Sequence, residues 1–153
     1  MTARALVTLS GGQDSTTCLW WALDQFGVSN VETITFDYGQ RHRIELTSAQ
    51  EIAADAGVPN TILPINTFAA LGGNALTDQS IAVGTNGDGE LPATYVPGRN
   101  LVFLTIAAAY AWPRGIEDII TGVAQTDYSG YPDCRSDTIE ALTSTLNLSL
   151  IHI

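Results

Sequence analysis

A chain of 153 residues with 45% hydrophobic and 14% charged residues can build one folded domain, and this composition excludes an intrinsically disordered protein. The net charge of −10 argues against a broad nucleic-acid-binding surface, which needs clustered Lys and Arg, and all 6 such residues of this chain are arginine. The apolar run over residues 101–112 is too short to span a bilayer, and no signal-peptide pattern opens the sequence, so we expect a cytoplasmic protein.

The first elements in the chain are a strand and a helix joined by glycines. Residues 6–9 are apolar and β-branched, which predicts a buried strand, and Gly11 and Gly12 follow at once. The spacing of apolar residues predicts a helix over residues 16–26. A glycine turn between a strand and a helix binds anions, because backbone N–H groups point outward and the helix dipole adds positive charge. We therefore expect a phosphate site here.

The polar residues of this turn support the same interpretation. Ser10 and Ser15 add hydroxyl donors, and the sequence lacks the G-x-x-x-x-G-K-[ST] pattern of a Walker A loop. Asp14 would repel phosphates unless it binds a Mg²⁺ that the phosphates share, or unless it caps the helix. The alternative is an ordinary strand-to-helix turn with Asp14 as its N-cap.

The middle of the chain continues as alternating strands and helices. Strands are predicted at 31–36 and 61–65, and the helix between them at 43–56. The order β-α-β-α-β implies a parallel sheet with right-handed crossovers. Residues 66–97 show little periodicity, and we interpret them as a lid, a partner-facing excursion or a disordered surface insertion.

The second half repeats the alternation. An almost entirely apolar run predicts a helix at 101–111 that is buried over most of its surface, followed by a strand at 116–122. A last helix is predicted from Ser136, its expected N-cap, to about residue 146.

Polar residues follow the strands where a ligand of a parallel sheet would bind. Arg99 lies just before the apolar helix, where it can contact an anion held by the helix end, or it is an ordinary surface arginine. The loop over residues 127–135 holds two aspartates, an arginine and two tyrosines. Such a loop suits a planar polar ring, although the same composition also occurs in turn-rich loops.

Four segments together resemble one family. Ser10–Leu19 resembles the SGGxDS loop of the PP-loop ATP pyrophosphatase superfamily. Residues 36–42, 95–100 and 127–135 resemble, in the same order, motifs of its QueC branch, the 7-cyano-7-deazaguanine synthases. The resemblance implies a Rossmann-like α/β fold, similar to the adenine nucleotide alpha hydrolases, with a parallel sheet flanked by helices.

The resemblance also implies an activity. Members of this branch convert 7-carboxy-7-deazaguanine and ammonia to 7-cyano-7-deazaguanine (preQ0), with ATP and Mg²⁺, through adenylated intermediates in queuosine biosynthesis. Such an enzyme is an ATP-dependent, C–N-bond-forming ligase. Its partners are small molecules, with no direct contact to nucleic acid or membrane, and it is expected to form a homodimer.

Site residues follow from the resemblance by position. Catalysis is assigned to Asp14, Ser15 and Arg99, and the metal to Asp14. ATP binding is assigned to Leu9, Ser10, Gly11, Gly12, Gln13, Asp14, Ser15, Thr16, Thr17, Phe36, Tyr38 and Gly39. Substrate binding is assigned to Arg99, Asn100, Asp127, Tyr128, Tyr131, Asp133 and Arg135.

The C-terminal part departs from the family pattern. The family carries a cysteine cluster there that holds a structural Zn²⁺, and Cys18 and Cys134, expected to be free thiols, do not replace it. Residues 148–153 resemble a translated sequencing adapter, so we expect a synthase domain over 1–147, cut before its zinc segment. The competing hypotheses are another adenylating PP-loop synthetase, a tRNA thiolase, which would need a cysteine pair and a basic face, and an inactive nucleotide-binding fragment.

Overall fold

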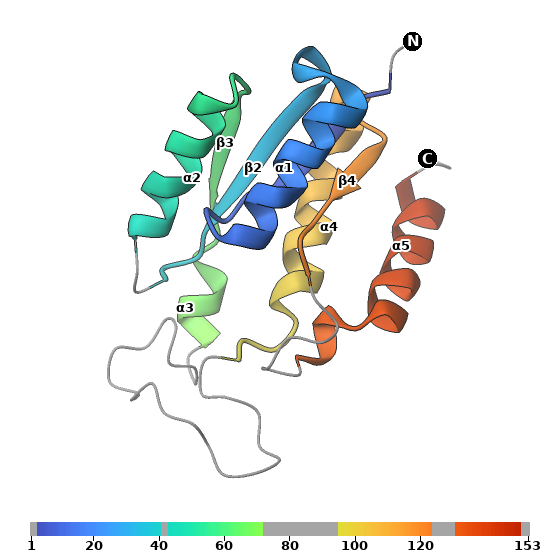
Figure 1. Ribbon diagram of the computed structural model, residues 1–153. Helices are drawn as coiled ribbons and strands as arrows, with labels where there is room; N and C mark the ends of the chain where they lie inside the picture. Colours follow the sequence, from blue (N-terminus) through green and yellow to red (C-terminus); the bar gives the residue numbers. More distant parts are fainter. Residues whose placement is uncertain (1–2, 41–42, 72–94, 124–130, 151–153) are drawn as a thin grey trace.

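A computed structural model describes residues 3–40, 43–71, 95–123 and 131–150. Its centre is a four-stranded parallel sheet of order β3-β2-β1-β4 (Figure 1). The strands are β1 (Ala5–Thr8), β2 (Val31–Asp37), β3 (Asn60–Pro64) and β4 (Asp118–Ile120). Ala5 pairs with Val31 on one side and with Asp118 on the other, so β1 is a central strand.

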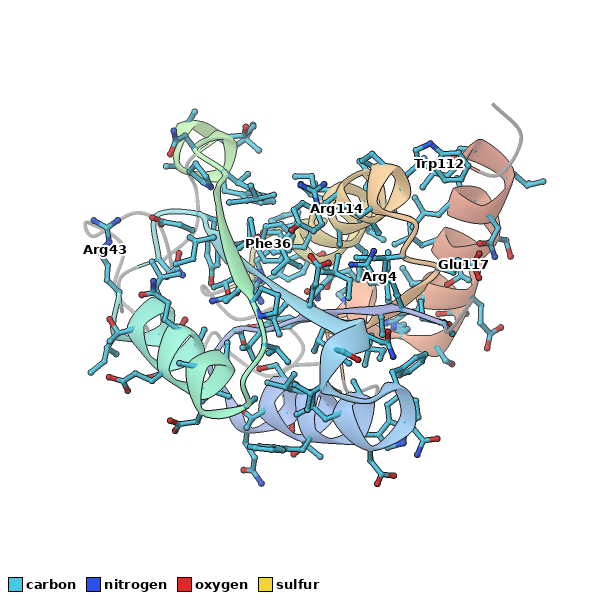
Figure 2. All side chains as sticks on the ribbon, turned by 90° about the horizontal axis from the view of Figure 1, so that it is seen from above. Arg4, Phe36, Arg43, Trp112, Arg114 and Glu117 are labelled. Atoms are coloured by element: carbon cyan, nitrogen blue, oxygen red, sulfur yellow. The ribbon has the colours of Figure 1, made fainter. Side chains whose placement is uncertain are left out.

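Helices cover both faces of the sheet. Helices α1 and α2 lie on one face and α4 on the other, with α5 beside α4 (Figures 1 and 2). The helices are α1 (Gln13–Phe26), α2 (Ile44–Asp55), α3 (Thr67–Leu71), α4 (Arg99–Ala111) and α5 (Ser136–Leu150). Short 3₁₀ turns lie at Val28–Asn30, Trp112–Arg114 and Pro132–Cys134. In the described ranges, no helix combines the length and the apolar character that a bilayer crossing requires.

The core has two layers because side chains alternate along each strand. Leu6 of β1 packs with Phe36 and with Ala107 of α4, whereas its neighbour Val7 packs with Leu19 of α1 and Ala49 of α2. Each of these apolar side chains is buried. Both faces of the sheet are thus buried under apolar side chains, as expected for a parallel sheet with helices on both sides.

The topology creates a cleft beside β1. The chain proceeds from β1 through β2 to β3 on one side, and α4 then returns it to β4 on the other side of β1. Because crossovers between parallel strands are right-handed, the helices of the two halves lie on opposite faces. The strand order therefore reverses between β1 and β4, and the carboxyl ends of the strands at such a reversal are the place where open α/β sheets bind ligands.

The predicted fold class is confirmed, and two helix starts are corrected. Helix α1 begins at Gln13, three residues earlier than predicted, with Gly12 as its N-cap. Asp14 is therefore inside the first turn and does not cap the helix. Ser136 is likewise the first residue of α5 and not its N-cap, because the Ile139 amide already donates to the carbonyl of Arg135.

The long segment after β3 is only partly described, whereas the apolar helix after it is described in full. The start of the 66–97 segment is helical, as α3, and residues 72–94 lie outside the described residues. The apolar helix predicted at 101–111 exists as α4, where Leu104, Ala107, Ala108 and Ala111 are buried. Val102, Thr105 and Ala109 form an exposed stripe along it.

Candidate active site

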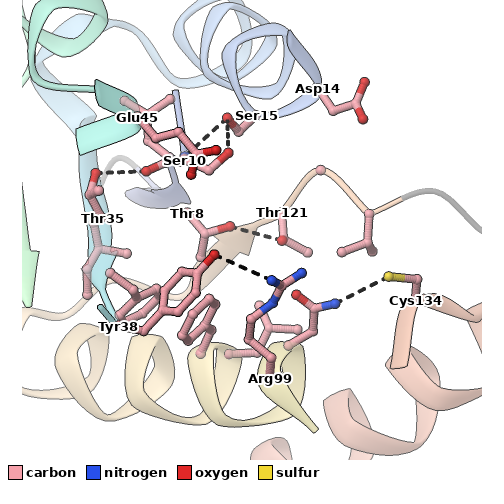
Figure 3. A pocket seen from close by; sticks show the side chains of 18 of the residues that line it. Thr8, Ser10, Asp14, Ser15, Thr35, Tyr38, Glu45, Arg99, Thr121 and Cys134 are labelled. Atoms are coloured by element: carbon pink, nitrogen blue, oxygen red, sulfur yellow. Dashed lines mark hydrogen bonds between the residues drawn. The ribbon is translucent and has the colours of Figure 1, made fainter. Parts of the chain in front are cut away.

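A cavity of about 500 Å³ opens at the carboxyl ends of β1, β2 and β4 (Figure 3). The N-terminal ends of α1 and α4 both reach it. Its walls are formed by Thr8, Leu9, Ser10, Asp14, Ser15, Ile34, Thr35, Phe36, Tyr38, Gln40, Glu45, Arg99, Asn100, Phe103, Leu104, Thr121, Gly122, Val123, Tyr131 and Cys134. The cavity thus occupies the cleft that the topology creates.

The glycine loop after β1 fits its surroundings only without side chains. Gly11 has φ +85°, and a Cβ there would lie 2.6 Å from the carbonyl oxygen of Glu45, in the first turn of α2. At Gly122, just after β4, a Cβ would lie 2.9 Å from the backbone of Asp14. Both contacts are far inside normal van der Waals separation. The two glycines therefore let α2 and the end of β4 approach the phosphate-binding turn that the sequence predicts.

Two serines fix the shape of that turn. The Ser10 amide donates to Ser15 Oγ at 3.2 Å, and the two hydroxyl oxygens are 3.1 Å apart. Ser15 Oγ also donates to the carbonyl of Gly12 at 3.1 Å. The hydroxyl of Thr16 turns back to the same carbonyl at 2.8 Å. These hydroxyls, and the N–H groups of Ser10 and Gly12 that donate to them, are used inside the turn. The groups left to meet an anion are therefore the N–H groups of the first turn of α1.

The start of α1 is open. Its N-cap Gly12 contributes no side chain, and no capping hydrogen bond reaches the helix start from a described side chain. The first-turn N–H groups of a helix have no partners within the helix, and they carry partial positive charge. The exposed carboxylate of Asp14 is the acidic group in that turn. An anion with an accompanying cation suits this place.

The facing wall is aromatic and carries a guanidinium. Arg99 Nη1 donates to the Tyr38 hydroxyl at 3.4 Å, and the guanidinium carbon lies 5.6 Å from the centre of that ring. Phe103 stacks on Phe36 at 4.4 Å between ring centroids and also contacts Tyr38. Burial raises the pKa of Tyr38, the Arg99 charge lowers it, and the Glu45 charge raises it. The charges of Arg99 and Glu45 therefore act on the same hydroxyl in the cavity.

A further group of contacts ties the loop after β4 to the start of α4. Asp133 Oδ2 accepts the Asn100 backbone N–H at 3.0 Å, and Asn100 Nδ2 donates to Cys134 Sγ at 3.2 Å. Tyr131 stacks on Tyr95 at 5.3 Å between ring centroids. Through these contacts the segment 131–134 forms one wall of the cavity.

The structure brings many of the site residues predicted from the sequence to one place. Leu9, Ser10, Asp14, Ser15, Phe36, Tyr38, Arg99, Asn100 and Tyr131 line the cavity. The cavity lining does not include the other predicted residues Gly11, Gly12, Gln13, Thr16, Thr17, Gly39, Asp133 and Arg135. Asp127 and Tyr128 lie outside the described residues. A position at the cavity does not test the role of a residue, so the catalytic and binding roles of all these residues stay predictions.

Sequence reasoning missed several residues of the cavity wall. Thr8 and Thr121 join the ends of β1 and β4 through a 2.9 Å hydrogen bond between their hydroxyls. Gln40 is buried and holds the turn after β2, accepting the Tyr38 amide at 3.0 Å. Glu45 projects from the first turn of α2 toward the cavity (Figure 3). The signal for Gln40 was its position just after the carboxyl end of a predicted strand, and the signal for Glu45 was its position in the first turn of the helix that follows.

The donor sets for metals differ between Mg²⁺ and Zn²⁺. Among the described residues, no group of three or more His, Cys, Asp or Glu side chains is arranged to hold a metal. Mg²⁺ still fits at Asp14, since this ion takes one or two carboxylates together with phosphate oxygens and water. A closed Zn²⁺ site does not fit, because Cys18 and Cys134 lie on separate elements and, as expected, form no disulfide.

Comparison with known sequences points to one family. The family model described as "Queuosine biosynthesis protein QueC" matches residues 4–153. A 7-cyano-7-deazaguanine synthase from Laribacter hongkongensis is 68% identical over 149 residues, and one from Chromobacterium violaceum is 66% identical over the same length. Each match covers 96% of this chain and 64% of the relative, so the chain spans about two thirds of the length of these proteins.

Solved structures support the fold alone. The predicted subunit of a tRNA methyltransferase from Methanocaldococcus jannaschii aligns with a TM-score of 0.57 at 18% identity, over 95% of this chain and 64% of that one. The NH3-dependent NAD synthetase from Campylobacter jejuni aligns with a TM-score of 0.54 at 17% identity, over 95% and 65%.

Proposed function

The chain belongs to the QueC family of queuosine biosynthesis proteins, and from this premise we propose that it acts as a 7-cyano-7-deazaguanine synthase. In this proposal it binds ATP and converts 7-carboxy-7-deazaguanine and ammonia to the 7-nitrile. The hypotheses of a tRNA thiolase or another PP-loop synthetase lose their support, because the family match extends over nearly the whole chain.

The observation that carries the proposal is the open start of α1 at the cavity. Its first-turn amides face the cavity without a side-chain cap from the described residues, while Gly11 and Gly122 leave no bulk around them. Backbone amides at a helix start are suited to bind the phosphates of a nucleotide. Such donors also stabilise charge on a departing pyrophosphate, because they are fixed before the reaction begins.

The opposite wall suits the second substrate. Tyr38, Phe103 and Tyr131 offer flat aromatic surfaces near the guanidinium of Arg99. A deazaguanine carboxylate is a flat ring with a negative group, so aromatic stacking and a charge-assisted hydrogen bond to Arg99 would bind it. This arrangement would place its carboxylate between Arg99 and the phosphate-binding turn.

The chemistry that follows is two successive adenylations. In the first, a carboxylate oxygen of the substrate attacks the α-phosphate of ATP, pyrophosphate leaves, and ammonia displaces AMP to give an amide and a proton. In the second, the amide oxygen attacks the α-phosphate of another ATP, pyrophosphate leaves again, and loss of AMP and two protons from the adenylated amide leaves the nitrile. The contribution of the protein is to position the reactants and to stabilise developing charge.

Mg²⁺ would be held by Asp14 together with the phosphates, and when bound it would neutralise phosphate charge. The residues of the turn bind and orient the phosphates whether or not the metal is present. A homodimer and a cytoplasmic location are further parts of this proposal, and both come from the family resemblance.

The decisive experiment measures AMP and pyrophosphate release by the purified chain with ATP, Mg²⁺, ammonium and 7-carboxy-7-deazaguanine. We expect release that depends on the deazaguanine acid and falls at least about 100-fold in Asp14→Ala, as for other groups that stabilise a transition state. Asp24→Ala is the matched control, because Asp24 is an exposed carboxylate on the same helix, away from the cavity.

Three outcomes separate the hypotheses. ATP binding without acid-dependent release identifies an inactive nucleotide-binding fragment. Release that is equal in Asp14→Ala and wild type contradicts the role of Asp14. Absence of ATP binding contradicts the phosphate site itself.

A further inference from the structure

The starts of two helices reach the cavity, and they differ in one respect. Helix α1 begins at Gly12 and is open, as described above. Helix α4 begins after Gly98, which has φ +70° and also contributes no side-chain cap. Its cap comes from a distant part of the chain instead, because Asp133 Oδ2 accepts the Asn100 N–H, 33 residues away, at 3.0 Å.

Asp133 is held firmly in this position. The side chain comes from the 3₁₀ turn Pro132–Cys134, and the residue is 5% exposed. Thr138 Oγ1 donates to the Pro132 carbonyl at 2.9 Å, which anchors the same turn to the start of α5. Asn100 returns the contact by donating from Nδ2 to Cys134 Sγ at 3.2 Å. The turn and the start of α4 are thus joined by two hydrogen bonds, and Asn100 donates both.

The second carboxylate oxygen makes this position costly. Asp133 Oδ1 is buried and has no hydrogen-bond partner within the described ranges. A buried polar atom without a partner lowers stability, so a residue chosen for stability alone would satisfy both oxygens or carry no charge. What the carboxylate supplies in return is a negative charge against the positive end of α4, directly behind Arg99 and Asn100.

We propose that Asp133 is a positioning residue that holds the first turn of α4, so that Arg99 and Asn100 face the deazaguanine acid. The inference rests on the proposed function and replaces the direct substrate contact expected from the sequence with an indirect role. Asp133 does not line the cavity, whereas Arg99 and Asn100 do. Because its carboxylate already occupies the positive end of α4, the phosphates of ATP bind at α1.

The proposal predicts a separation between the two substrates. Asp133→Ala should raise the KM for 7-carboxy-7-deazaguanine about tenfold, the effect of losing one hydrogen bond to a charged group. The Kd for ATP should remain within about twofold, because the phosphate-binding turn does not contact Asp133. Asp133→Asn keeps a side-chain oxygen acceptor without the charge, and it should restore a large part of the loss.

A structural readout accompanies the kinetics. Amide hydrogen exchange at Asn100, followed by NMR, should be at least about tenfold faster in Asp133→Ala than in wild type. Asp137→Asn is the matched control, because Asp137 is an exposed carboxylate that also accepts a backbone N–H at a helix start, that of Thr138 at 2.8 Å. It should change neither the Asn100 exchange rate nor the KM for the acid.

The outcomes distinguish this inference from the proposed function. If AMP and pyrophosphate release by the wild type does not depend on 7-carboxy-7-deazaguanine, the proposed function is overturned. The Asn100 exchange rate then still tests whether Asp133 caps α4. An unchanged exchange rate in Asp133→Ala overturns the cap. Equal losses of ATP affinity and acid affinity assign Asp133 a general structural role and overturn the positioning role. If Asp133→Ala does not fold, Asp133→Asn carries the same comparisons with smaller expected changes, and an acid KM and an Asn100 exchange rate equal to those of wild type would overturn the role of the carboxylate charge.

Discussion

The two ends of the sheet use polar residues in opposite ways. At the amino end, Arg4 forms an ion pair with Glu32 and donates to the carbonyl of Arg114. Tyr110 donates to Glu32 at 3.3 Å and is 2.9 Å from the hydroxyl of Thr61. The guanidinium of Arg114 lies 3.6 Å over the Tyr110 ring. Each of these polar groups contacts another residue of the protein.

At the carboxyl end, polar groups face a cavity instead. The amides at the start of α1, the exposed carboxylate of Asp14 and the guanidinium of Arg99 line or border a space of about 500 Å³. The hydrogen bond from Arg99 to Tyr38 is long, at 3.4 Å. The comparison teaches that the same sheet supports a network that stabilises the fold at one end and a set of groups available to a ligand at the other.

The largest expected effect separates two glycines, one from each end. Gly11→Ala combines a positive φ with a contact 2.6 Å from the Glu45 carbonyl, so we expect a loss of about 3 kcal/mol from strain and overpacking together, with loss of ATP binding. Gly115 has φ +63°, and a Cβ added there would meet nothing within 4 Å, so Gly115→Ala should cost only about 1–2 kcal/mol. Urea unfolding and ATP titration measure both quantities.

Gly115→Ala also serves as the control for backbone strain. It lies at the amino end, and it should leave ATP affinity unchanged. Equal effects of the two substitutions on ATP binding would contradict the assignment of the phosphates to the turn at Gly11.

A smaller effect is expected from the amino-end network. Glu32→Gln preserves the shape of the side chain and removes its charge, and it should lower the free energy of unfolding by about 1 kcal/mol, since the ion pair with Arg4 is partly exposed to solvent. Its effect on ATP affinity should be nil. A double-mutant cycle with Arg4→Met isolates the pair, and any change in ATP affinity would show that the two ends are coupled.

The fold was largely predictable because its signals are local. Apolar alternation and glycine positions predicted all four strands of the described sheet and their helices, and the parallel order followed from β-α-β connectivity. The helix starts were less accurate. Gly12, not Asp14, is the N-cap of α1. Glycine is also common at the N-cap, but it has no side chain to make a capping hydrogen bond, so the sequence alone favoured the aspartate.

The site was predictable only where motifs mark it. Thr8 and Thr121 are 113 residues apart, and their contact depends on the placement of β4 beside β1, which the sequence does not reveal. Trp20 and Trp21 illustrate the same limit: their types favour the core, yet they are 52% and 53% exposed because Leu19 and Ala22 take the inner face of α1. Tertiary packing decides both cases.

The smallest expected effect is a pair of opposite changes in the pKa of Tyr38, at the carboxyl end of the sheet. Burial raises the pKa of Tyr38, the Arg99 charge lowers it and the Glu45 charge raises it. Glu45→Gln should therefore lower the Tyr38 pKa and Arg99→Met should raise it, as measured by NMR titration of the labelled tyrosine ring. The Glu32→Gln variant, at the far end, is the control and should leave this pKa unchanged.

The raised pKa also gives stability a pH dependence of known sign. Above the ordinary tyrosine pKa of about 10, the unfolded chain loses the Tyr38 proton first, so the native state binds more protons. The contribution of Tyr38 to stability is therefore complete below pH ~10 and is lost as the pH rises through the folded-state pKa. Tyr38→Phe should remove this part of the alkaline decline in urea unfolding. An unchanged alkaline decline in Tyr38→Phe would mean that other groups, at either end of the sheet, cause it.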